Sequence, residues 1–201
     1  MIWKRLIVVL TLVYGAGLVL AVRAQQGPGD GPRYANGNSL IRPTDYREWI
    51  FLGSGLGLTY LPPANTPASP SFGNVFVNPS SYRSFMQTGM WPNATMFVLE
   101  IRRSSSEGGL VKDGKFQAEL VALEAEVKDS RFPEGWAYFN WGPARALKDV
   151  ADPAPANAAS PGEETCAECH TRHTAVERTF VQFYPTLLEV ARQKGTLKPG
   201  F

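Results

Sequence analysis

Two cysteines and a histidine near the C-terminus have the types and the spacing to do chemistry. Cys166 and Cys169 are separated by two residues, and His170 follows the second cysteine directly. A C-x-x-C-H run is typical of covalent haem attachment. Two intervening residues place both sulfurs near one face of a helical turn, where each thiol can add to a haem vinyl group, and the imidazole can bind the iron. The run therefore predicts one covalently bound haem c per chain, with His170 as axial ligand.

Three other uses of the cysteine pair compete with haem attachment. A structural disulfide suits an exported protein, but it needs no histidine at this place. A thioredoxin-like redox pair needs a βαβ context, which the surrounding sequence does not show. A zinc site needs more ligands, and His173 is the only other histidine of the chain. Two cysteines and two histidines so close together would crowd one tetrahedral ion, so we favour haem attachment.

The sixth ligand of the iron is left open by the sequence. His173 lies three residues after His170 on the same helical side, so it cannot reach the opposite face of the haem. The methionines that could do so are Met86, Met90 and Met96. We favour an open or water-bound position, because no methionine follows the motif. An open iron indicates ligand binding or catalysis and a filled one indicates electron transfer, so the sequence does not decide whether the chain is an enzyme.

The first 24 residues have the pattern of a Sec-type signal peptide. Lys4 and Arg5 precede an apolar run over 6–22, and Val22-Arg23-Ala24 permits cleavage after Ala24. We therefore predict a signal peptide over 1–24 and an exported, periplasmic protein. An uncleaved membrane anchor is the alternative, although the apolar run of about 17 residues is at the short end for a span.

The composition predicts a folded protein without a strongly charged surface. Of the 201 residues, 44% are hydrophobic and 19% are charged, as in globular domains. Without the three basic residues of the first 24, the formal net charge falls from +2 to −1. Such a chain has no polybasic field, so we expect no nucleic-acid partner.

The elements that must position the motif are predicted to be strands followed by helices. A flexible lead-in over 25–44, rich in Gly, Pro and Asn, precedes one domain over 45–201. Strands are predicted at 72–77, 96–102 and 136–141, and helices from Asn78-Pro79, around the motif and from Pro185. The run 116–127 has helix-forming residues but alternates like a strand. The connections between strands are too short for crossover helices. We therefore predict an α+β fold, a predominantly antiparallel β-sheet with flanking helices and the haem-attachment helix near the C-terminus.

Several segments outside the motif point to a known family. They include Tyr46-Arg-Glu-Trp-Ile-Phe-Leu-Gly53, Leu123-Glu-Ala-Glu-Val-Lys-Asp129 and Phe180-Val-Gln-Phe-Tyr-Pro185, which follows the C-x-x-C-H run. With these segments the chain, over roughly 46–195, resembles the cytochrome P460 family, which includes the gas-binding cytochromes c′-beta. The resemblance implies a largely β fold, a five-coordinate haem c and a homodimer.

The resemblance also bears on the reaction. Hydroxylamine-oxidising members cross-link to the porphyrin edge a lysine that directly precedes a glutamate; here Leu99 precedes Glu100, and no lysine occurs between Lys4 and Lys112. The chain is therefore more similar to the cytochromes c′-beta, in which aromatic side chains cap the distal face. Candidates for the distal pocket are Leu99, Phe97, Phe76 and Phe72, with Phe51 as a further aromatic.

An apolar distal cap favours small neutral ligands over charged ones. We expect an exported haem c protein that binds a gas such as nitric oxide or performs nitrogen-oxide redox chemistry, together with a redox partner protein. The alternatives are a hydroxylamine or nitric oxide oxidoreductase of the P460 type and a His/Met electron-transfer cytochrome.

Overall fold

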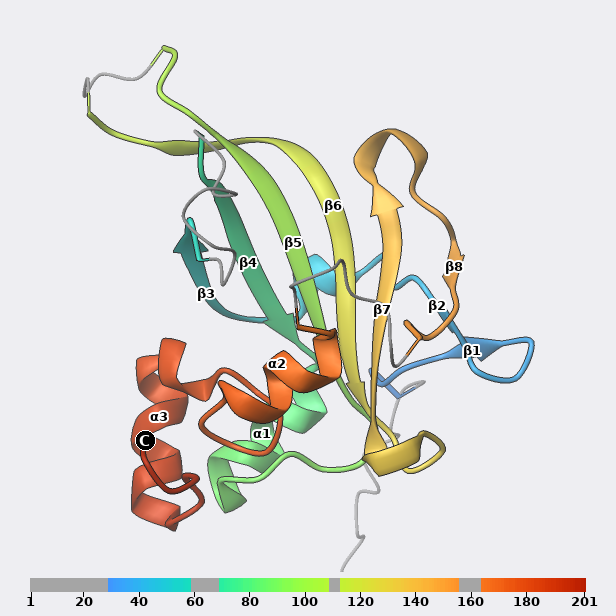
Figure 1. The fold of residues 1–201 in the computed structure, drawn as a ribbon, viewed down its shortest axis with the longest axis vertical. Coiled ribbons are helices and arrows are strands. Elements are labelled where there is room, and N and C mark those ends of the chain that lie inside the picture. Colours follow the sequence, from blue (N-terminus) through green and yellow to red (C-terminus); the bar gives the residue numbers. More distant parts are fainter. Residues whose placement is uncertain (1–28, 59–68, 109–112, 156–163) are drawn as a thin grey trace, which may run out of the picture.

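A computed structural model describes residues 29–58, 69–108, 113–155 and 164–201 (Figure 1). The predicted signal peptide over 1–24 lies outside these residues. Within the described ranges, no helix combines the length and the apolar character needed to cross a membrane.

Two antiparallel sheets form most of the fold. The large sheet follows chain order: β3 (Ile50–Leu56), β4 (Ser71–Val77), β5 (Thr95–Ser105), β6 (Phe116–Lys128) and β7 (Trp136–Pro143). The small sheet has the order β1 (Tyr34–Ala35), β2 (Ser39–Ile41) and β8 (Val150–Ala151). Every pair of neighbouring strands is antiparallel. The predicted α+β class is confirmed.

The α-helices of the described residues gather at one end of the large sheet (Figure 1). They are α1 (Pro79–Thr88), α2 (Cys166–Arg172) and α3 (Pro185–Lys194). Both α1 and α3 begin at a proline in the first helical position, where the missing N–H has no helical partner to lose. Both end at a glycine with positive φ, Gly89 at 74° and Gly195 at 67°.

The run 116–127, whose residue types favour a helix but whose alternation favours a strand, is a strand. Along β6, Leu123, Ala125 and Val127 are buried in one core, so the alternate residues Glu124 and Glu126 face the other side of the sheet. Pairing with β5 and β7 supplies backbone hydrogen bonds on both edges, which outweighs the helical preference of its residues.

The large sheet separates two hydrophobic cores. Met96 and Val98 of β5 belong to one core, whereas Phe97 between them belongs to the other. Because successive side chains of a strand point to opposite faces, the two cores lie on opposite sides of the sheet. The core on the Phe97 side contains Phe85 of α1 and Leu187 of α3, so the helices cover that face.

The segment predicted as a lead-in over 25–44 contains β1 and β2 in its described part. Leu40 is fully buried in the core opposite the helices, and Trp141 donates an indole hydrogen bond to its carbonyl at 3.3 Å. Around Leu40, this burial fixes a backbone that the Gly, Pro and Asn content predicts to be flexible.

A buried carboxylate, Glu100, joins β4 and β5 to the helical turn at 46–48 on the face opposite the helices. It is 3% exposed and accepts hydrogen bonds from Tyr46 at 2.5 Å, Arg47 at 2.6 Å and Arg102 at 2.5 Å. Burial by itself would raise the pKa of Glu100, but these hydrogen bonds outweigh it and lower the pKa to about 2.

This shift predicts how stability depends on pH. The pKa of Glu100 falls from 4.5 to about 2 on folding, so its stabilisation is present above about pH 4.5 and is lost as the pH falls through about 2. At about 1.4 kcal/mol per pKa unit, we expect Glu100→Gln to lower the free energy of unfolding at neutral pH by on the order of 3 kcal/mol. Denaturant unfolding of both proteins across this pH range measures the effect.

The matched control is Glu119→Gln. Glu119 pairs with Arg103 at 2.9 Å, but both side chains are more than 60% exposed, so the change should cost under about 1 kcal/mol. Parallel pH profiles for the wild-type and Glu100→Gln proteins would contradict the assignment.

Candidate functional site

The short helix α2 carries both cysteines and His170. Its N-terminus is closed by a capping box, in which the Thr165 hydroxyl accepts from the Glu168 N–H at 3.2 Å and the Glu168 carboxylate accepts from the Thr165 N–H at 2.8 Å. The helix therefore begins at Cys166. Residues three and four apart share one face of a helix, which brings the two thiols and the imidazole to the same side.

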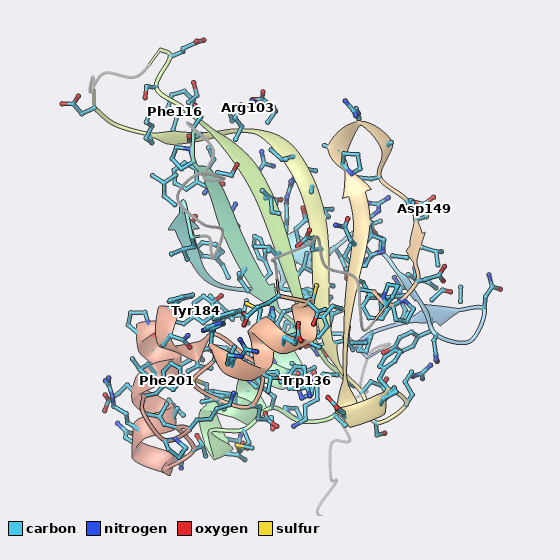
Figure 2. All side chains as sticks on the ribbon, in the orientation of Figure 1. Arg103, Phe116, Trp136, Asp149, Tyr184 and Phe201 are labelled. Atoms are coloured by element: carbon cyan, nitrogen blue, oxygen red, sulfur yellow. The ribbon has the colours of Figure 1, made fainter. Side chains whose placement is uncertain are left out.

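These three side chains line a cavity of ≈ 370 Å³ between α2 and the large sheet. Tyr184, labelled in Figure 2, lies beside α2 and belongs to the lining. A second cavity of ≈ 280 Å³ shares Val75, Leu99, Phe180 and Tyr184 with the first, so the two cavities are adjacent. Their sizes are those of small-molecule and cofactor pockets.

The imidazole of His170 is held in a defined orientation. Its Nδ1 lies 2.8 Å from the carbonyl oxygen of Arg178. A carbonyl oxygen only accepts, so Nδ1 donates, and in the neutral ring Nε2 keeps a free lone pair. The rings of Tyr138 and Phe180 pack against the imidazole with centroids 4.7 and 4.8 Å away. A histidine held in this way is suited to bind a metal through Nε2.

The two thiols lie near carboxylates, and Cys166 is exposed whereas Cys169 is half-buried. Partial burial, followed by the charge of Glu124, raises the pKa of Cys166. Partial burial and then the charge of Glu164 raise the pKa of Cys169. Both are free thiols in the structure and are held in the protonated form at neutral pH.

Three carboxylates contribute to the cavity lining. Glu164 pairs with Arg172 and with His173, whose Nε2 lies 2.8 Å from its Oε2. Glu124 accepts from the side-chain amide of Asn140 at 2.9 Å, and burial raises its pKa. Glu126 has its Oε1 3.1 Å from Nδ1 of His170. Burial alone would lower the pKa of His170, but the charge of Glu126 outweighs it and raises that pKa.

The structure brings some of the sequence-predicted residues together and separates others. Phe97 and Leu99 line the cavity with Cys166, Cys169 and His170, and Phe72 lines the neighbouring cavity. Phe76 instead packs against Tyr46 and Phe51, each with ring centroids 5.4 Å away. The reason is strand alternation: its neighbour Val75 faces the cavities, so Phe76 points to the other side of the sheet.

The candidate methionines lie away from both cavities. Met96 is 1% exposed in the core opposite the helices, Met86 packs in the core beneath them and Met90 is 40% exposed. In the described part of the chain no methionine lines either cavity.

The motif-based zinc alternative gains no support. Among the residues that the structure describes, no group of three or more His, Cys, Asp or Glu is arranged to hold a metal ion. The residues present fit a haem instead, because two thiols and an imidazole with a free Nε2 share one mainly apolar cavity.

Sequence reasoning missed the side chains that surround His170. Tyr138, Phe180 and Glu126 lie 32, 10 and 44 residues away from it in the chain. A signal for Glu126 was present, because 123–127 alternates apolar and acidic residues. If that run is a strand with one face in a core, both of its carboxylates must lie on the other face.

A comparison with known protein families identifies the family of the chain. A family model described as Cytochrome P460 matches residues 43–181, which is more than half of the chain and includes β3 to β8 and α2. The family that the sequence resembles is thereby confirmed. None of the curated proteins matches the chain.

Proposed function

Because the chain belongs to the cytochrome P460 family and is therefore a haem protein, we propose that it holds this haem covalently through Cys166 and Cys169, with His170 on the iron and the opposite face open to small neutral ligands such as nitric oxide. One observation carries the proposal: both thiols and the imidazole line one cavity, and Nδ1 is engaged by a backbone carbonyl that leaves Nε2 free.

The chain contributes attachment, orientation and exclusion of water. When bound, the haem supplies iron redox and ligand chemistry. The capping box starts α2 at Cys166, which presents both sulfurs on one helical face. Tyr138 and Phe180 hold the imidazole plane, and the apolar residues Phe97 and Leu99 offer no hydrogen bond to water or to an anion.

The absence of methionine from the described cavity lining supports an open sixth position over His/Met electron transfer. Leu99 supports ligand binding over hydroxylamine oxidation. It lines both cavities at the place where the family resemblance puts the cross-linking lysine, and an aliphatic side chain cannot form that bond. Export through the signal peptide over 1–24, a homodimer and a redox partner protein complete the proposal.

Absorption spectroscopy of the purified protein tests ligand binding. We expect the ferrous spectrum to change on addition of nitric oxide, because the sixth position is open to a neutral diatomic molecule. A spectrum that does not respond to the gas would refute an open site. A sulfur-to-iron charge-transfer band in the oxidised protein would point to His/Met ligation instead.

Turnover with hydroxylamine and an electron acceptor tests the alternative reaction. We expect no turnover, and we expect mass spectrometry to find two thioether bonds and no third link to the haem. A further covalent bond would mean that the chain belongs with the hydroxylamine-oxidising members.

A further inference from the structure

Glu126 is a buried carboxylate that faces the imidazole of His170. The residue is 9% exposed, and its Oε1 lies 3.1 Å from Nδ1. The Nδ1–H itself is directed at the Arg178 carbonyl at 2.8 Å. Oε1 is thus within ion-pair distance of the ring, yet it has no hydrogen-bond partner among the described residues.

Such an arrangement is costly without a positive charge close by. Removing a carboxylate from water costs several kcal/mol unless a cation or hydrogen bonds compensate it. The guanidinium of Arg178, whose charge acts on His170, is paired with Glu134. Within the described residues, the one ion-pair contact of Glu126 is with His170. The structure therefore directs an unsatisfied negative charge at the imidazole.

We propose that Glu126 is a positioning residue that strengthens His170 as an iron ligand and biases the bound haem toward its ferric state. The inference rests on the proposed function. A carboxylate beside the far nitrogen of a metal-binding histidine increases the donor strength of the ring. A fixed negative charge beside the axial ligand would also stabilise the more positive, oxidised centre over the reduced one.

Glu124 is the matched control for this contact. It lies two residues earlier on the same face of β6 and lines the same cavity. Its carboxylate, however, accepts a hydrogen bond at 2.9 Å from the side-chain amide of Asn140 on the neighbouring strand β7. Neutralising Glu124 removes a nearby charge without removing the Glu126–His170 contact.

The experiment compares Glu126→Gln, Glu126→Asp and Glu124→Gln in the haem-loaded protein. The readouts are the midpoint potential, from a spectroelectrochemical titration, and the iron–histidine stretching frequency of the ferrous protein, from resonance Raman spectra. We expect Glu126→Gln to favour the ferrous form about tenfold, which is about 59 mV for one electron. The stretching frequency should fall in the same variant, because the imidazole becomes a weaker donor.

The two other variants separate the effect of the Glu126–His170 contact from the effect of a nearby negative charge. Glu126→Asp keeps the charge but withdraws it from Nδ1, so the frequency should fall while the potential rises less than in Glu126→Gln. Glu124→Gln should raise the potential less than Glu126→Gln and leave the frequency unchanged. An unchanged frequency in both Glu126 variants, with haem attached, would overturn the inference and leave the proposed function intact. A wild-type protein without covalent haem would instead overturn the proposed function.

Discussion

A chain with both Cys166→Ala and Cys169→Ala is expected to lose all covalently bound haem. Each thioether bond needs a cysteine sulfur, and the two thiols that line the cavity beside His170 are the only cysteines of the sequence. Acid–acetone extraction should leave the haem with the wild-type protein and remove it completely from the double variant. The pyridine haemochrome spectrum of each fraction measures the amount.

The single variants serve as internal controls. Cys166→Ala and Cys169→Ala should each retain at most one thioether, which shifts the haemochrome band from that of the wild-type protein. Haem that resists extraction from the double variant would contradict the attachment site. A wild-type protein that is colourless and forms a Cys166–Cys169 disulfide, when produced in a host that matures c-type cytochromes, would favour the structural alternative.

Replacing His170 by glycine is expected to separate attachment from iron ligation. The two thioethers should survive, because both thiols remain, but the iron should lose its axial ligand and its normal spectrum. Nε2 is the free nitrogen of this ring, since Nδ1 donates to the Arg178 carbonyl. Added imidazole should enter the space left by the side chain and restore most of the wild-type spectrum.

His173→Ala is the matched control for that change. His173 follows His170 by three residues and caps the C-terminus of α2. Its Nε2 lies 2.8 Å from the Glu164 carboxylate. Its loss should leave the oxidised and reduced spectra unaltered. If His173→Ala, rather than His170→Gly, altered the spectrum, the assignment of the axial ligand would have to be exchanged.

The local features of this protein could be predicted from short stretches of sequence. The C-x-x-C-H run specifies its own geometry, because three side chains within five residues share one face wherever that helix lies. The boundaries of α1 and α3 follow from Pro79 and Gly89 and from Pro185 and Gly195, whose backbone restrictions act within one turn. The predicted helix starts after Asn78 and at Pro185 are confirmed.

Neighbouring strands decided what these local signals left open. The run 116–127 became β6 because β5 and β7 pair with both of its edges. The same alternation separates the aromatic candidates, since Phe97 faces the cavity and Phe76 faces the opposite core. Residue type could not distinguish them, because an apolar ring suits either face of the sheet.

The sequence by itself therefore determined the family, through the segments that resemble it, and the α+β class and the arrangement of the three motif residues, which depend on patterns and spacing within a few residues. Only the tertiary structure decided which groups surround His170. The Arg178 carbonyl, the rings of Tyr138 and Phe180 and the carboxylate of Glu126 reach it from β6, β7 and the chain after α2. Contacts between residues so far apart in the chain depend on how the strands and helices pack, and no local pattern encodes them.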